Sequence, residues 1–136
     1  MILVGYGRVG SLVGADLAVA AVPFLVIEDS DTHADALKAA NIELIVGNAA
    51  ASQVLDRANL AGARCLVVAI PDPFEAGQAI EQGRKLNPGL QIIARAHSDA
   101  EVAHLTRLGA DQVVMGEREI ARCMIAALLP APVPQT

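Results

Sequence analysis

Three glycines near the start of the chain have the spacing of a phosphate-binding turn. Gly5, Gly7 and Gly10 form G-x-G-x-x-G between the apolar segment 1–4 and a segment with helical periodicity. In such a turn the first glycine permits the bend, the second lets backbone approach a pyrophosphate, and the third lets the helix pack on the sheet. The helix N-terminus attracts phosphate, and Arg8 adds a full positive charge. The spacing predicts a nucleotide site, although a tight strand–helix turn without a ligand has the same pattern.

An acidic residue further along the chain strengthens this interpretation. Glu28 ends the second apolar segment, 18 positions after Gly10. This is close to the spacing at which a carboxylate holds the ribose hydroxyls of a dinucleotide. The next residue, Asp29, adds a second negative charge that would repel a 2′-phosphate. We therefore expect NAD(H) or an adenine nucleotide as the ligand rather than NADP(H).

The side chains that could perform catalysis form no arrangement typical of an enzyme. Tyr6 is the only tyrosine and has no lysine four residues later, so the Tyr-x-x-x-Lys proton relay is absent from the sequence. Asp72 and Glu75 are interpreted as turn and helix-start residues. The three histidines have no paired carboxylate at a spacing that suggests a general base, and we interpret them as surface residues; they are His33, His97 and His104. We expect a binding module with no catalytic residue.

Composition limits the class of protein. The 136 residues are 54% hydrophobic but only 2% aromatic, which favours one compact domain with an aliphatic core. A net charge of −5, with scattered basic residues, argues against nucleic acid as a partner. Cys65 and Cys123 form no CxxC motif, so we expect no metal site and a reducing, cytosolic setting. No apolar stretch approaches the roughly 20 residues of a membrane span.

Apolar and helical segments alternate along the chain. Strands are expected at 1–4, 24–28, 43–46, 64–70, 91–96 and 111–115, and helices at 8–22, 32–40, 52–58, 73–86, 99–108 and 117–129. Helix signals support these bounds: Pro73 in a first turn, the capping box Ser98 and Glu101, and Gly109 after a last turn.

This alternation predicts an α/β fold. Six strands with intervening helices give a doubly wound parallel six-stranded sheet, a Rossmann fold, with strand order 3-2-1-4-5-6. The domain is expected to span 1–129, and the Pro-rich segment 130–136 is expected to be a tail or linker. Because a strand begins at residue 1, we expect this chain to be a piece of a longer protein.

Several separated segments, in order, resemble the TrkA-N domain, also called the RCK domain (regulator of potassium conductance). They are GYGRVG, the acid Glu28, VGNA, VVAIPDPFEAGQ, IIARAHS and LGADQVVMGEREIA. Two stretches, AIPDPFEAG and ARAHS, are most similar to the cytosolic domain of Kef/YbaL-type bacterial cation:proton antiporters. The resemblance covers the chain up to the Pro-rich tail, and it is more specific than the glycine motif alone.

The resemblance implies a regulatory function. A domain of this family binds NAD(H), AMP, ADP or ATP at the cytoplasmic face of the bacterial inner membrane. Its ligand changes the packing of a domain dimer, and this change gates a potassium or monovalent cation transporter. Here the transporter is expected on the same polypeptide. The implied cofactor-binding residues are Gly5, Gly7, Arg8, Val9 and Gly10 around phosphate, Glu28 with Asp29 at the ribose, Asn48 and Ala49, and Ala69, Ile70 and Arg95 around the cleft.

One segment departs from the family pattern. The family usually has Gly-Asp-Ala followed by Thr or Ser, whereas this chain has Gly47, Asn48, Ala49 and Ala50. The missing carboxylate and hydroxyl change the adenine-side contacts that the resemblance implies, which leaves the preferred nucleotide open.

An alternative function also stays open. The regulatory domain is the favoured interpretation, and its rival is the cofactor-binding fragment of an NAD-dependent oxidoreductase whose catalytic part lies elsewhere. Membrane spans before Met1 of the full-length protein would favour the regulatory domain. A substrate domain after the tail would favour the oxidoreductase.

The last helical segment carries an apolar stripe with two alternative uses. Its residues recur at helical spacing: Ile120, Ala121, Met124, Ile125 and Leu128. The stripe either covers the sixth strand of its own sheet or, as the resemblance implies, crosses over to a partner domain and forms a homodimer. Gly116, between strand and helix, favours the second use because it allows the helix to swing outward.

Overall fold

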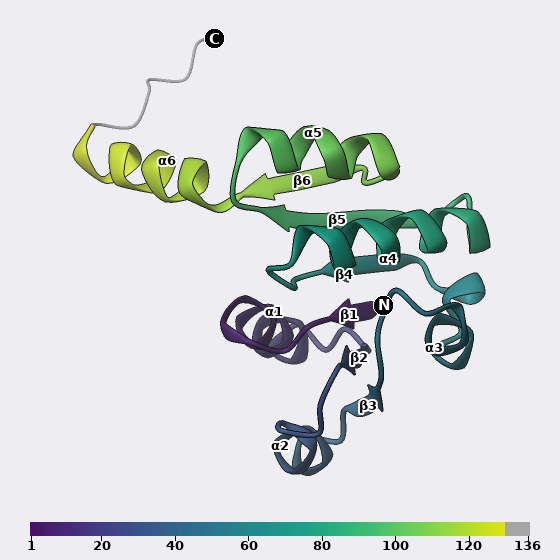
Figure 1. Ribbon diagram of the computed structural model, residues 1–136. Coiled ribbons are helices and arrows are strands. Elements are labelled where there is room, and N and C mark those ends of the chain that lie inside the picture. Colours follow the sequence, from purple (N-terminus) through teal and green to yellow (C-terminus); the bar gives the residue numbers. More distant parts are fainter. Residues whose placement is uncertain (130–136) are drawn as a thin grey trace, which may run out of the picture.

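The computed structural model describes residues 1–129 as alternating strands and helices around one parallel sheet (Figure 1). The sheet has six strands in the order β3-β2-β1-β4-β5-β6, which confirms the predicted α/β fold and strand order. The predicted tail, 130–136, lies outside the described residues. The strands are β1 (Ile2–Val4), β2 (Leu25–Glu28), β3 (Glu43–Val46), β4 (Cys65–Val68), β5 (Gln91–Ala96) and β6 (Gln112–Met115).

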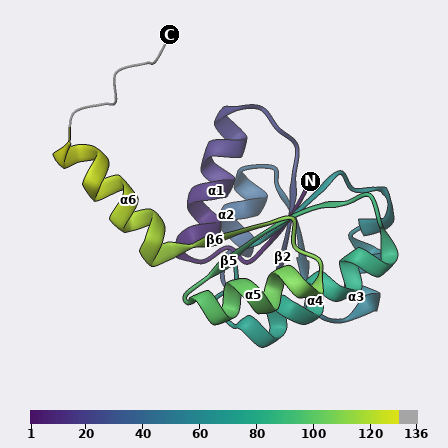
Figure 2. The same cartoon turned by 90° about the horizontal axis from the view of Figure 1, so that it is seen from above.

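The first two helices cover one face of the sheet and the next three cover the other, as the view from above shows (Figure 2). The helices are α1 (Arg8–Val19), α2 (Ala34–Ala39), α3 (Ser52–Arg57), α4 (Pro73–Leu86), α5 (Asp99–Leu108) and α6 (Gly116–Leu128). A short 3-10 helix, η1 (Leu60–Gly62), precedes β4 and was not expected from the sequence.

Two apolar clusters form the core, one on each face of the sheet. The larger joins β1, β2, β4 and β5 to α3, α4 and α5, with Leu55, Leu66 and Ile80 fully buried. The smaller, around Leu3 and Val26, lies under α1 and α2. Because neighbouring residues of a strand point to opposite faces, β1 contributes to both clusters. Because helices pack on both faces of the sheet, the strands and the loops at their ends are held in place.

Local signals set the helix ends. Ser98 Oγ accepts a hydrogen bond from the Glu101 N–H at 3.2 Å, which confirms Ser98 as the N-cap of α5, while the Glu101 carboxylate accepts from the His97 N–H rather than the Ser98 N–H of a full capping box. The α1 helix ends at Val19, earlier than the predicted 22, because Ala21 adopts a left-handed conformation with φ +57. The Val22 N–H then donates to the Leu17 carbonyl at 2.9 Å and closes the helix.

The α1 helix packs closely on the sheet through glycines, as the third glycine of the turn predicts. Gly10 and Gly14 are its buried residues, and a Cβ on either would lie within 3 Å of a protein atom. Val13 is partly buried against the smaller cluster, while Val9 is 37% exposed.

The last helix packs least against its own domain. α6 leaves the end of β6 and points away from the sheet (Figures 1 and 2), and none of its residues is buried. Its apolar stripe lies in the open, with Ile120 60%, Met124 63% and Leu128 77% exposed. The alternative in which this stripe covers the sixth strand of its own sheet is therefore wrong for this structure.

Candidate functional site

A cleft lies at the carboxyl ends of the strands, where the strand order reverses between β1 and β4. Its volume is about 670 Å³, within the usual range for a small-molecule site. In open α/β sheets ligands bind at this reversal, because the loops on either side diverge and leave a crevice. The cleft is lined by Val4, Gly5, Gly7, Arg8, Val9, Ile27, Glu28, Asp29, Gly47, Ala49, Ala69, Ile70, Pro71, Asp72, Glu75 and Arg95.

Two glycines build the turn at the floor of the cleft. Gly5 has φ +93, a conformation that favours glycine, and its N–H donates to the Ile27 carbonyl at 2.9 Å. A Cβ on Gly10 would lie 2.0 Å from the carbonyl oxygen of Gly5. Both glycines are therefore required by the protein's own backbone. Gly10 itself is buried and does not line the cleft.

The glycine between them has no steric cause. A Cβ on Gly7 would meet no protein atom within 4 Å. Its backbone, with φ −79 and ψ −145, lies outside the regions that residues with a side chain favour, so the turn itself also suits glycine there. Gly7 nevertheless lines the cleft. The missing side chain therefore leaves space on the ligand side of the turn, where a pyrophosphate would approach the backbone.

The α1 N-terminus faces this space with its donors free. Gly7 is the N-cap and provides no side-chain cap, while the Gly7 carbonyl accepts from the Ser11 N–H at 2.9 Å. The amides of the first helical turn therefore have no partner within the helix. Together with the helix dipole and the guanidinium of Arg8, they make the phosphate side of the cleft electropositive.

Glu28 lies at the end of β2 with its carboxylate largely buried, 13% exposed. Its Oε1 accepts a hydrogen bond from the Tyr6 N–H, which ties the glycine turn to β2. Its Oε2 lies 3.7 Å from Nδ1 of His33. The carboxylate is thus held at the cleft wall, where its remaining lone pairs can accept from ribose hydroxyls.

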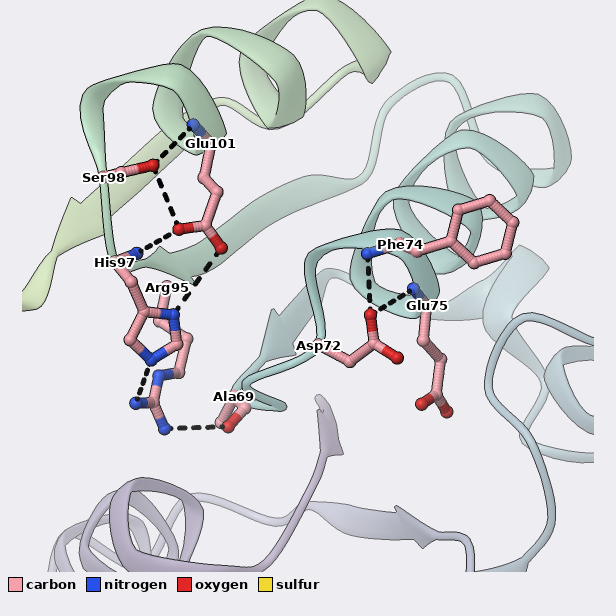
Figure 3. A network of polar contacts seen from close by, with 8 residues as sticks. All are labelled: Ala69, Asp72, Phe74, Glu75, Arg95, His97, Ser98 and Glu101. Carbon is pink, nitrogen blue, oxygen red and sulfur yellow. Dashed lines mark hydrogen bonds and ion pairs between the residues drawn. The ribbon is translucent and has the colours of Figure 1, made fainter.

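The opposite rim is acidic. Asp72 caps α4 by accepting from the Phe74 N–H at 2.9 Å, and Glu75 lies in the first turn of the same helix (Figure 3). Desolvation, with the negative charges of Asp29 and Asp72, raises the pKa of Glu75. The carboxylates from the ends of β2 and β4 are therefore close enough to repel one another across the cleft.

A second cation reaches the cleft from β5. Arg95 is half-buried, and its Nη1 donates to the Ala69 carbonyl at 3.5 Å while its Nη2 lies 3.2 Å from Nε2 of His97 (Figure 3). Arg8 and Arg95 thus bring positive charge to the cleft from two different elements.

The cleft brings together ten of the predicted cofactor-binding residues: Gly5, Gly7, Arg8, Val9, Glu28, Asp29, Ala49, Ala69, Ile70 and Arg95. Gly10 supports the turn from behind. Asn48 is exposed and is outside the lining, because its Oδ1 accepts from the Ala50 N–H at 2.8 Å in a local turn.

Sequence reasoning missed six lining residues: Val4, Ile27, Gly47, Pro71, Asp72 and Glu75. Asp72 and Glu75 were interpreted only as turn and helix-start residues, which they are, but they also face the cleft. Their position directly after β4, the strand at the reversal, is the signal that could have identified them.

Within residues 1–129, no group of three or more His, Cys, Asp or Glu side chains could hold a metal ion. No helix in that part of the chain combines the length and the apolar composition needed to cross a membrane.

The doubly wound sheet, the glycine turn and the cleft at the strand reversal define a Rossmann-type domain. The chain belongs to the TrkA-N domain family, which matches residues 1–116. It is 49% identical over 127 residues to the putative cation/proton antiporter YbaL of Escherichia coli, covering 93% of this chain but 23% of YbaL. It is 32% identical over 130 residues to potassium channel protein 1 of Methanocaldococcus jannaschii, covering 91% of this chain and 39% of the channel. The chain therefore spans less than half the length of these relatives.

Solved structures show the same fold. The TrkA-N domain of the inner membrane protein YbaL from Escherichia coli superposes with a TM-score of 0.90 at 48% identity, covering 94% of this chain and 95% of that domain. The AMP-bound Kef C-terminal domain of Shewanella denitrificans gives 0.78 at 27% identity, covering 96% and 82%. The GsuK channel bound to NAD gives 0.76 at 21% identity, covering 90% and 22%, which shows the fold alone.

Proposed function

We propose that this domain binds NAD(H) or an adenine nucleotide and regulates a membrane transporter of monovalent cations without being an enzyme. The observation that carries the nucleotide site is Gly7, which lines the cleft and leaves open the space that a side chain would occupy, with no protein atom within 4 Å of it. The phosphates lie over the N-terminus of α1, and the adenosine ribose lies on Glu28.

The charges of the cleft support this orientation. Cationic groups, Arg8 and the free amides of α1, gather on the phosphate side. Glu28 and Asp29 place negative charge where an adenosine ribose lies, which disfavours a 2′-phosphate. A neutral ribose edge therefore fits there better than the additional phosphate of NADP(H).

The regulatory part of the proposal rests on the relatives and on α6. Proteins similar over nearly the whole chain are named as a cation/proton antiporter and a potassium channel. The uncovered stripe of α6 fits a second copy of the domain. Nucleotide occupancy then changes the packing of this dimer and gates a transporter on the same polypeptide, at the cytoplasmic face of the inner membrane.

Removal of the Glu28 side chain tests the ribose assignment. Glu28→Ala is expected to weaken binding of NADH or AMP by roughly 1.5–3 kcal/mol, the value of a hydrogen bond to a charged group. Isothermal titration measures this loss. Because Glu28 also accepts from the Tyr6 N–H, Glu28→Gln is the sharper variant: its amide oxygen keeps that bond and removes the charge. Glu43→Gln, at the other end of the sheet, is the matched control. Unchanged affinity for every adenine nucleotide would contradict the assignment.

Addition of a side chain to Gly7 tests the phosphate assignment. Gly7→Ala is expected to lower the free energy of unfolding by about 1–2 kcal/mol, because alanine is a poorer N-cap and adopts ψ −145 less readily, although the new Cβ meets no protein atom. Nucleotide affinity is expected to fall at least tenfold (about 1.4 kcal/mol), since the methyl group occupies the space of the pyrophosphate. A variant that binds like the unmodified chain would place the phosphates elsewhere.

A kinetic assay separates this function from that of an oxidoreductase fragment. The unmodified chain is expected to bind NADH without oxidising it in the presence of small carbonyl substrates, because the proposed function is ligand binding alone. Steady NADH oxidation would favour the oxidoreductase.

A further inference from the structure

We propose that His97 is a positioning residue of the nucleotide cleft: its Nε2 accepts a hydrogen bond from Arg95 and holds that guanidinium, with its charge unneutralised, for an anionic group of the ligand. The proposal deepens the function assigned above and rests on it. His97 itself does not line the cleft and acts through Arg95.

The guanidinium of Arg95 is held between two neutral acceptors (Figure 3). One is the Ala69 carbonyl at the end of β4, 3.5 Å from Nη1, and the other is Nε2 of His97, 3.2 Å from Nη2. The two bonds leave from different terminal nitrogens of a planar group, so together they fix its orientation as well as its position. An arginine with no such support would sample many rotamers, and ordering them on binding would cost affinity.

The chemistry of arginine decides which nitrogen of His97 carries a proton. Arginine has N–H donors and no acceptor, so the Arg95 bond requires a lone pair on Nε2. In the neutral ring the proton then lies on Nδ1, which faces Oε1 of Glu101 at 3.6 Å. The hydrogen bond from Arg95 therefore sets the tautomer, and the position of the Glu101 carboxylate beside Nδ1 is favourable for it.

Glu101 is itself held in place. Its Oε2 accepts from the His97 N–H at 3.0 Å and from the Ser98 hydroxyl at 3.1 Å. Desolvation raises the pKa of Glu101, but these hydrogen bonds outweigh it and hold that pKa below its ordinary value. Glu101 is thus an ionised acceptor that orients the His97 ring from the first turn of α5.

The neutral acceptors matter because the cleft is rich in carboxylates. Within residues 1–129, Arg95 forms no ion pair with any of them, although Asp29, Asp72 and Glu75 line the same cleft. A carboxylate in place of His97 would neutralise the guanidinium. A histidine fixes it and leaves the positive charge for a phosphate or another anionic group of the nucleotide.

Titration with AMP and with NADH tests the proposal in four chains: unmodified, Arg95→Ala, His97→Ala and the double variant. Arg95→Ala and His97→Ala are each expected to weaken binding about tenfold, as for a lost hydrogen bond to a charged group. In the Arg95→Ala background, His97→Ala is expected to add no further loss. His97→Gln, which places an amide near the position of Nε2 and provides an acceptor there, is expected to recover most of the affinity.

Nitrogen-15 NMR of the His97 ring provides a readout that a merely structural role would not give. The expected spectrum near neutral pH has a protonated Nδ1 and an unprotonated Nε2. In Arg95→Ala this preference is expected to decrease, because the acceptor loses its donor. Thermal unfolding of each variant checks the fold, and His97, 49% exposed, is not needed for the core.

Several results would overturn the proposal: unchanged affinity in His97→Ala, an equal loss from His97→Ala in the presence and absence of Arg95, or a ring protonated on Nε2. These outcomes leave nucleotide binding by the unmodified chain intact. Failure of the unmodified chain to bind AMP or NADH is a different result, which would overturn the proposed function and the ligand role of Arg95 with it.

Discussion

The first and last helices of the domain begin in similar ways but differ in burial: α1 packs against the sheet, and α6 is exposed along its length. Both follow a strand closely, both have a glycine at the start, and both carry apolar residues at helical spacing. α1 presses two glycines against the turn and the neighbouring aromatic rings of Tyr6 and Phe24. α6 buries none of its residues, and its most apolar side chains are uncovered.

The two helices therefore leave different features uncovered: open space beside Gly7 at α1 and apolar surface along α6. At α1 packing is so close that each glycine has a steric cause except Gly7, and the space left there fits a small ligand. At α6 no close packing occurs, and the apolar surface of the helix has no contact within the domain that would explain it. Exposed apolar stripes of this kind commonly mark a protein interface.

Adding one methyl group near the start of each helix is expected to give the largest difference in the free energy of unfolding between α1 and α6. Gly10→Ala places a Cβ 2.0 Å from the Gly5 carbonyl oxygen, and because backbone cannot yield, the free energy of unfolding is expected to fall by about 3 kcal/mol or more. Gly116→Ala places a Cβ 4.0 Å from the Ala96 carbonyl oxygen and is expected to be neutral or stabilising by up to about 1 kcal/mol. Urea denaturation measures both, and similar losses in the two variants would remove the contrast.

A charge in the α6 stripe is expected to act on association rather than folding. Light scattering of the intact chain is expected to give twice the monomer mass of 14.1 kDa, and truncation after Gly116 is expected to give the monomer. Met124→Glu is expected to weaken dimerisation at least tenfold, about 1.4 kcal/mol, while the unfolding of the monomer stays unchanged because Met124 is exposed.

The matched control for this variant is Ala126→Glu, which adds the same charge to the opposite face of α6, beside the Glu119–Arg122 ion pair. It is expected to leave the dimer intact. An intact chain that remains monomeric at high micromolar concentration would show that the exposed stripe is not a self-association surface.

The smallest effect is expected at the acidic rim of the cleft. Since the folded protein raises the pKa of Glu75, the unfolded chain releases this proton first, and stability falls as pH rises from the ordinary glutamate range through the raised pKa. Glu75→Gln removes this dependence and is expected to stabilise the protein by about 0.5 kcal/mol at pH 7 and not at all below that range. Thermal melting across pH measures it.

Glu81→Gln on the same helix serves as the comparison for Glu75→Gln. Glu81 pairs with Lys85 at 3.4 Å, so its neutralisation is expected to be neutral or slightly destabilising at pH 7. A stabilisation of the same size in both variants would indicate a general effect of net charge rather than repulsion within the cleft.

The sequence by itself determined the fold and the centre of the site. Strand runs alternating with helical periodicity are local patterns, and the sheet order follows because consecutive strands pair and crossovers have one hand. The glycine turn, the N-cap at Ser98 and the acid at Glu28 are equally local, since each depends on residues whose spacing is fixed by the elements themselves.

Only the tertiary structure decided which side chains from different elements meet. The contact of Arg95 with the Ala69 carbonyl depends on the register of β4 against β5, and the acidic rim depends on how α4 approaches the end of β2. Asn48 bonds the Ala50 N–H of its own loop, and the sequence pattern does not distinguish this local bond from a contact with the cleft. For Arg95 and for the acidic rim, the deciding quantity is a distance between segments far apart in the chain, which a pattern along one segment does not contain.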